Sequence, residues 1–128
     1  MPRKRSLVLT DHELRLMEVM WQRKRATVAD VVESLAPPPL AYSTVLTTLR
    51  TLEQKGYIVH EEDGRAYVYR PVVERDAAAK SALRHVLDRF FDSSPGALAV
   101  TLLDEGALSD DDVTEIRRLL AKSRKGGA

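Results

Sequence analysis

Apolar residues recur at helical spacing in three short stretches at the start of the chain, which predicts three helices. The first begins with a capping box, in which Thr10 and Glu13 exchange hydrogen bonds. The second begins at Thr27 and ends before the prolines at 37–39, because proline lacks the backbone donor that a helix needs. The third runs from about Ala41 to Lys55 and is followed by Gly56, a residue that often ends helices.

The pattern then changes to strand-forming residues at positions 57–62 and 65–70, with Asp63-Gly64 between them. Asp-Gly between two such runs is typical of a tight hairpin turn. Three helices followed by a hairpin is the order of elements in a winged helix-turn-helix. In DNA-binding proteins of this kind a recognition helix enters the major groove, and we expect the hairpin, or wing, to contact the flanking backbone.

Helical spacing returns at about residue 74 and continues in three further segments. We therefore predict a mainly α fold with a small β-hairpin wing. The winged helix-turn-helix occupies residues 1–72, and a helical dimerisation domain occupies residues 73–128.

The C-terminal segments hold more large apolar side chains than a thin helical layer can bury against itself. A second copy of the chain would bury them through a two-fold interface. A compact monomer, folded back on the first domain, is the alternative. The residues that we expect in the dimer interface are Val86, Phe90, Phe91, Leu98, Leu102, Leu103, Ile116, Leu119 and Leu120.

The third helix has an apolar side and a side rich in threonine. Threonine is a poor helix former, about 0.5 kcal/mol worse than alanine, and a merely solvated surface would favour Glu and Lys. Short hydroxyls can bond phosphates and base edges, and the methyl group can contact thymine. A tolerated neutral face is the alternative. We expect Thr44, Thr47, Arg50 and Thr51 to contact the groove, Ser43 and Lys55 to contact phosphate, and Arg65 to act from the wing.

Composition excludes several classes of function. The chain has no cysteine, which rules out disulfides, thiolate metal sites and a cysteine nucleophile. The three histidines lie on different elements, and no catalytic constellation is found, so we expect no metal, no cofactor and no enzyme activity. A net charge of +1 does not by itself indicate DNA binding. The basic residues 1–5 are either an arm along DNA or a solvated tail.

No apolar run is long enough to span a bilayer, and the basic start is not followed by the continuous apolar segment of a signal peptide, so we expect none. We therefore expect a cytoplasmic protein without direct membrane insertion.

The sequence resembles the penicillinase-repressor family, the BlaI/MecI/CopY group, over nearly its whole length. Each matching residue is weak evidence alone, but so many in this order are specific. They are Leu9-Thr10, Glu13-Leu14, Met17, Met20-Trp21, Ala26-Thr27-Val28, Val31, Tyr42 through Leu49, Leu52, Lys55-Gly56, Gly64-Arg65-Ala66, Tyr69 and Phe91-Asp92.

The resemblance implies a homodimeric repressor that binds a double-stranded DNA operator. In several members a membrane sensor-protease detects β-lactam and triggers cleavage within the dimerisation helices, at an Asn-Phe bond. The corresponding positions here are Thr101 and Leu102, which depart from that pattern. The copper-responsive members carry C-terminal cysteine pairs that this chain lacks, so copper sensing is not expected. The main competing interpretation is a winged helix that serves as a protein–protein interaction module without an operator.

Overall fold

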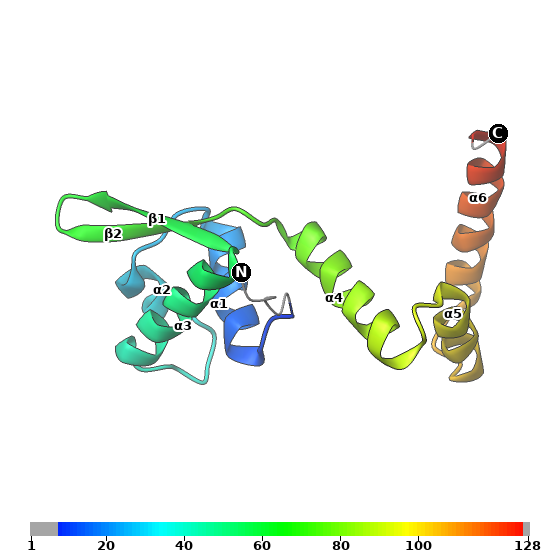
Figure 1. Ribbon diagram of the computed structural model, residues 1–128, viewed down its shortest axis with the longest axis horizontal. Coiled ribbons are helices and arrows are strands. Elements are labelled where there is room, and N and C mark those ends of the chain that lie inside the picture. Colours follow the sequence, from blue (N-terminus) through cyan, green and yellow to red (C-terminus); the bar gives the residue numbers. More distant parts are fainter. Residues whose placement is uncertain (1–7, 127–128) are drawn as a thin grey trace, which may run out of the picture. The chain divides into compact units, whose positions relative to one another are not determined.

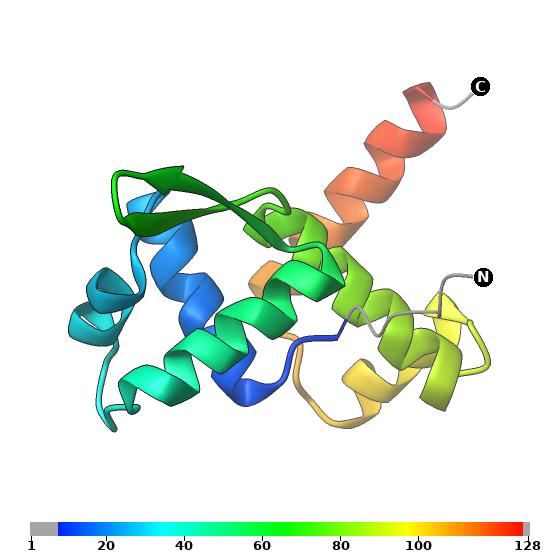
Figure 2. The same ribbon diagram turned by 60° about the vertical axis from the view of Figure 1, so that its left-hand side comes forward.

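The computed structural model describes residues 8–126, and the chain divides into two compact units, one up to His85 and one from Val86 onward. The first unit contains three helices, a hairpin and the start of a fourth helix. In Figures 1 and 2 the hairpin lies along one side of the three helices. The elements are α1 (Asp11–Arg23), α2 (Val28–Ser34), α3 (Tyr42–Lys55), β1 (Ile58–Asp63), β2 (Ala66–Pro71) and the beginning of α4 (Arg75–Phe90).

The predicted apolar faces of the first three helices meet in one core. On α3, Val45, Leu49 and Leu52 are completely buried, as the helical spacing predicted. The hairpin closes the same core with aromatic and aliphatic side chains from its base. The other core residues include Leu16, Met17, Met20, Val31, Tyr57, Ile58 and Tyr69.

The predicted helix starts are confirmed by their hydrogen bonds. The Thr10 hydroxyl accepts from the Glu13 amide at 3.2 Å, and a Glu13 carboxylate oxygen accepts from the Thr10 amide at 2.9 Å. The same reciprocal pair joins Thr27 and Asp30 at the start of α2. The backbone bond from Thr27 lowers the pKa of the Asp30 carboxyl. Gly56 ends α3 in the left-handed region, with φ of 88°, which a residue without Cβ adopts at little cost.

The hairpin turn lies one residue later than the sequence predicted. Asp63 pairs with Ala66 in the last rung of the ladder, so Gly64 and Arg65 form the two-residue turn. Gly64 has φ of 65°, while Arg65 keeps a negative φ. A two-residue turn with Gly at its first central position suits the twist of a hairpin, and it competes successfully with the expected Asp-Gly turn.

The expected domain boundary at residue 72 leaves out the beginning of α4, which packs with the first unit. Ala78 is buried in the core of the winged helix, and Val73 packs against that core. The sequence showed where the helix starts, but not that Arg75 contacts α1 or that Ala78 joins the core. Contacts therefore group α4 with the first unit as far as His85.

The second unit consists of the end of α4 and two further helices, α5 (Pro95–Asp104) and α6 (Asp110–Gly126). Side chains cap the starts of both helices: the Ser94 hydroxyl accepts from the Ala97 amide, and Ser109 and Asp112 exchange hydrogen bonds. Of the helices described in the structure, none is sufficiently long and apolar to cross a membrane.

Candidate nucleic-acid interface

Helix α3 divides sharply into a buried side and a solvent side. Ser43, Thr47, Arg50 and Gln54 are exposed and follow one another at intervals of three or four residues. Positions with this spacing lie on the same side of a helix. The opposite side is locked into the core, so the fold fixes the direction in which this polar row points. The row contains one cation and no carboxylate, which suits a polyanionic partner.

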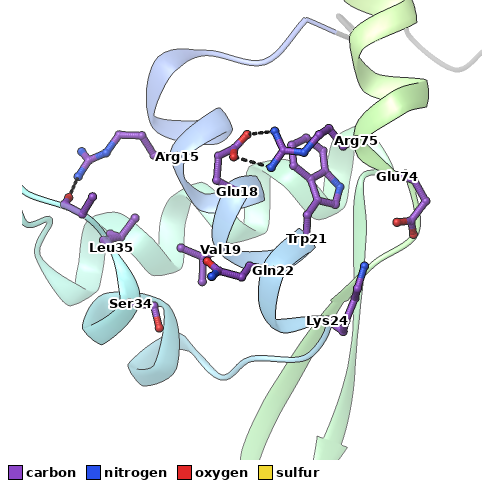
Figure 3. Close-up of a pocket in the computed structure, with 11 residues that line it drawn as sticks. Arg15, Glu18, Val19, Trp21, Gln22, Lys24, Ser34, Leu35, Glu74 and Arg75 are labelled. Atoms are coloured by element: carbon purple, nitrogen blue, oxygen red, sulfur yellow. Dashed lines mark hydrogen bonds and ion pairs between the residues drawn. The ribbon is translucent and has the colours of Figure 1, made fainter.

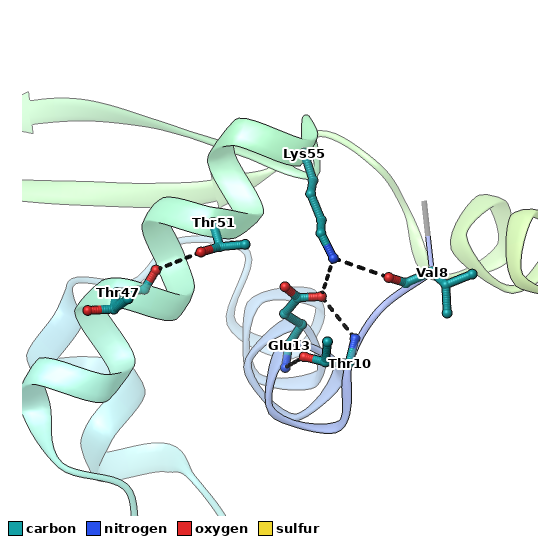
Figure 4. Close-up of polar contacts among 6 residues, drawn as sticks. All are labelled: Val8, Thr10, Glu13, Thr47, Thr51 and Lys55. Atoms are coloured by element: carbon teal, nitrogen blue, oxygen red, sulfur yellow. Dashed lines mark hydrogen bonds and ion pairs between the residues drawn. The ribbon is translucent and has the colours of Figure 1, made fainter. Parts of the chain in front are cut away.

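The threonines on this helix differ in how they use their hydroxyls. The Thr51 hydroxyl donates to the Thr47 carbonyl at 3.1 Å, as Figure 4 shows. The Thr48 hydroxyl donates likewise to the Thr44 carbonyl at 2.8 Å. Such bonds to the preceding turn satisfy the hydroxyl within its own helix. Thr51 therefore offers a methyl group and an acceptor oxygen outward, whereas the exposed Thr47 hydroxyl has greater freedom to donate.

A shallow hollow of about 250 Å³ lies at the first half of α3, and Ser43, Thr44, Thr47 and Thr48 line it. All four side chains carry hydroxyl groups. Ala41, at the N-cap position, provides no side-chain hydrogen bond to the helix start. The hollow thus gathers hydroxyl groups, which bond phosphate and base-edge acceptors.

Lys55 is the predicted DNA-contacting residue whose position differs most from expectation. Its ammonium is 2.7 Å from a Glu13 carboxylate oxygen and donates to the Val8 carbonyl at 3.2 Å (Figure 4). The Lys55 side chain is 17% exposed and that of Glu13 is 5% exposed. The ammonium is engaged inside the fold because it neutralises a buried carboxylate, so we leave Lys55 out of the candidate DNA contacts.

The tip of the wing presents one arginine among carboxylates. Arg65 is exposed in the turn itself, while Glu61, Glu62 and Asp63 are exposed on the preceding strand. Arg25 lies 3.7 Å from Glu61 and offsets part of this charge. Carboxylates repel the DNA backbone, so the turn with Arg65 is better suited to a backbone contact than the strand that carries Glu61 and Glu62.

A contact between α3 and the wing was missed by sequence reasoning. The His60 Nδ1 lies 2.8 Å from both carboxylate oxygens of Glu53, and the His60 ring stacks on Tyr67 with centroids 4.4 Å apart. Tyr69 is the cross-strand partner of His60, and Tyr67 is its diagonal neighbour, so the aromatic contact follows from the register. The contact between His60 and Glu53 joins a strand to a helix, and no short-range pattern in the sequence predicts it.

The predicted dimer residues are mostly exposed within the chain. Val86, Phe90, Leu102, Leu103, Ile116, Leu119 and Leu120 are all more than one-third exposed, and Phe91 and Leu98 are half-buried. On α6, Ile116, Leu119 and Leu120 share one side of the helix, because they are spaced by three and four residues. Thr101 lies within α5, and its hydroxyl donates to the Ala97 carbonyl at 3.0 Å. The basic residues 1–5 lie outside the described part of the chain.

A three-helix core with a two-stranded wing and an exposed polar recognition helix defines a winged helix-turn-helix DNA-binding protein. A protein-family model described as penicillinase repressor matches residues 9–122. The chain therefore belongs to the penicillinase repressor family.

Similar proteins agree with this assignment. The penicillinase repressor of Bacillus licheniformis is 26% identical over 91% of this chain and 94% of its own length. The transcriptional regulator BlaI of Mycobacterium tuberculosis is 33% identical over 92% of this chain and 86% of its own length. The solution structure of the DNA-binding domain of the repressor BlaI matches with a TM-score of 0.51 and 28% identity, covering 59% of this chain and 93% of that domain.

The protein is thus a DNA-binding transcriptional repressor of the BlaI/MecI type, and not an enzyme.

Proposed function

We propose that the repressor acts as a homodimer, binds a dyad-symmetric operator that overlaps a promoter, and thereby blocks RNA polymerase. The observation that carries this proposal is the orientation of α3. Its aliphatic side is completely buried, and its exposed row of Ser43, Thr47 and Arg50 faces outward beside the wing. A repressor works where the chromosome is, so we place it in the cytoplasm.

The groove contacts come from the exposed side of α3. Arg50 offers a guanidinium fork that matches the acceptor pair of guanine, and Thr47 offers a hydroxyl and a methyl group. Thr44 and Thr51 border the same surface, and Thr51, whose hydroxyl donates to the Thr47 carbonyl, contributes mainly a methyl group and an acceptor oxygen. Ser43 contacts phosphate near the helix start, and Arg65 contacts the backbone from the wing turn.

The dimer forms through the second unit. Its exposed apolar side chains include Phe90, which is 73% exposed, and Leu103, Leu119 and Leu120, which are half-exposed or more. Exposed groups of this kind mark interaction surfaces, and a second copy offers the same surface for a two-fold contact. Two recognition helices would then meet half-sites about 34 Å apart, one turn of DNA.

Relief of repression is proposed to occur by proteolysis at Thr101 and Leu102, with a membrane sensor-protease as the upstream partner. Both residues lie inside α5, so the helix has to open locally before a protease can act on its backbone. A β-lactam is the inducer to test, because the sensor-protease of several members of the penicillinase repressor family detects one. Recovery of only intact chain from β-lactam-treated cells, with repression lifted, would contradict this route.

The direct test is selection of binding sites by the wild-type protein from a library of randomised duplexes. The proposal predicts enrichment of sequences with two inverted half-sites. It also predicts a steep salt dependence of affinity, since each phosphate neutralised adds about 0.9 to the negative log–log slope. A protein-interaction module without an operator would enrich no sequence, and this result would overturn the proposal.

A further inference from the structure

The start of α4 is attached to α1 through Arg75. The two guanidinium Nη atoms donate to the two carboxylate oxygens of Glu18 at 2.6 and 2.5 Å. The same guanidinium lies over the ring of Trp21, with Cζ 4.8 Å from the ring centroid. Figure 3 shows Arg75 between these two partners, at the edge of a cleft of about 580 Å³. Arg75 therefore joins two residues of α1, one by a fork of hydrogen bonds and one by stacking.

Trp21 also fixes the chain immediately before α4. Its indole N–H donates to the Val73 carbonyl at 2.9 Å, and its side chain is 7% exposed overall. One turn into α4, Ala78 is buried against the same core. The segment is thus held before the helix, at its first residue and after its first turn. We call Glu18, Trp21 and Arg75 the α1–α4 clasp.

The clasp contributes more to geometry than to stability. The side chains of Arg75 and Glu18 are 59% and 44% exposed, and exposed ion pairs contribute about 0–1 kcal/mol. A planar guanidinium that is bound edge-on by a carboxylate and face-on by an indole has its orientation set by both partners. The hydrogen bonds to Glu18 raise the pKa of Arg75, so the fork remains charged.

We propose that Arg75 is a positioning residue that sets how α4 leaves α1, and so restricts the distance between the two recognition helices of the repressor dimer. The inference rests on the proposed homodimer. Helix α4 continues without interruption to Phe90 and is the only covalent path from the winged helix to the second unit. If the start of α4 is held less firmly, each winged helix moves more freely. The dimer then binds an operator with two fixed half-sites less tightly.

The absence of cysteine allows a direct measurement of this distance. Gln54 is exposed on α3, so Gln54→Cys gives one spin label per chain. Electron–electron double resonance on the DNA-free dimer then reports the distribution of distances between the two labels. We expect Arg75→Gln to widen this distribution. Arg75→Lys should widen it as well, because lysine keeps the charge but cannot form the fork.

The matched control is Lys80→Gln, which removes an exposed ion pair with Asp76 inside α4 and leaves the clasp intact. Its distribution should equal that of the wild type. For a duplex selected by the wild-type protein, Arg75→Gln should lose about tenfold in affinity through lost preorganisation. For a duplex that carries one half-site, the same variant should keep the wild-type affinity. Fluorescence of Trp21, the sole tryptophan, reports whether the clasp has opened.

Two results would overturn the inference and are distinguishable. Equal distance distributions for wild type and Arg75→Gln, in a dimer confirmed by mass, would remove the positioning role while leaving the proposed function intact. A wild-type protein with the mass of a single chain would remove the dimer, and the inference together with it. If Arg75→Gln fails to fold, it will show no unfolding transition in urea. The distance distribution of Arg75→Lys then tests the positioning role in its place.

Discussion

Replacing Lys55 with methionine is expected to lower the free energy of unfolding by about 3 kcal/mol, the lower end of the range for breaking a buried ion pair. The cause is the Glu13 carboxylate, which belongs to a side chain that is only 5% exposed and would lose its counter-charge. Methionine keeps most of the lysine stem volume, so the loss reports the charge and not a cavity. Urea unfolding of both proteins measures the difference.

A second substitution separates the buried charge from other effects. Glu13→Gln in the Lys55→Met background should recover most of the loss, because a neutral amide tolerates burial better than a carboxylate and glutamine also supports a capping box. Lys80→Met, in an exposed pair, should change stability little.

DNA binding by the Lys55 variant distinguishes the two roles considered for this residue. If Lys55 contacts phosphate, as the sequence predicted, its replacement lowers the salt slope of binding by about 1. The ion pair with Glu13 predicts an unchanged slope under conditions where the variant is folded. A lower slope with unchanged stability would mean that the pair does not hold the ammonium in solution.

Replacing Leu119 with aspartate is expected to convert the repressor into single chains and to weaken operator binding by about 100-fold or more. Leu119 is 50% exposed on the apolar side of α6, and a carboxylate there would be buried without a partner in the proposed interface. A dimer that contacts two half-sites binds about 10²–10⁴ times more tightly than a single chain that contacts one. This gain is lost when the dimer dissociates. Sedimentation equilibrium and anisotropy titration measure the two effects.

Thr114→Asp is the matched control for this prediction. It adds the same charge to an exposed position of α6, on the side opposite to Leu119. Its mass and affinity should match those of the wild type. A dimeric Leu119→Asp protein with normal affinity would show that the interface lies elsewhere in the chain.

Local chemistry explains why so much of the fold could be predicted from the sequence. The capping boxes at Thr10 and Thr27 each join residues three positions apart, and the buried side of α3 follows from periodicity alone. The hairpin was predicted correctly, but its turn was placed one residue early. Both Asp63-Gly64 and Gly64-Arg65 put glycine at a position that tolerates positive φ, and only the register of the ladder decides between them.

Long-range contacts explain what could not be predicted. Lys55 and Glu13 are 42 residues apart, and Arg75 and Glu18 are 57 apart. Nothing in the surrounding sequence distinguishes these side chains from solvated surface charges. The threonines of α3 illustrate a related limit. Their number indicated an outward-facing function, but two of the hydroxyls donate to the preceding helical turn, which composition does not reveal.

The central claim is that the exposed side of α3 reads the operator, and Arg50 is the residue that tests it most directly. Arg50→Ala and the control Arg84→Ala, an exposed arginine on α4, are titrated at fixed salt against a duplex selected by the wild-type protein. Loss of about 1–3 kcal/mol for Arg50→Ala, with relaxed preference at one base pair and no change for Arg84→Ala, is the predicted result. Wild-type affinity and base preference in Arg50→Ala would contradict the claim.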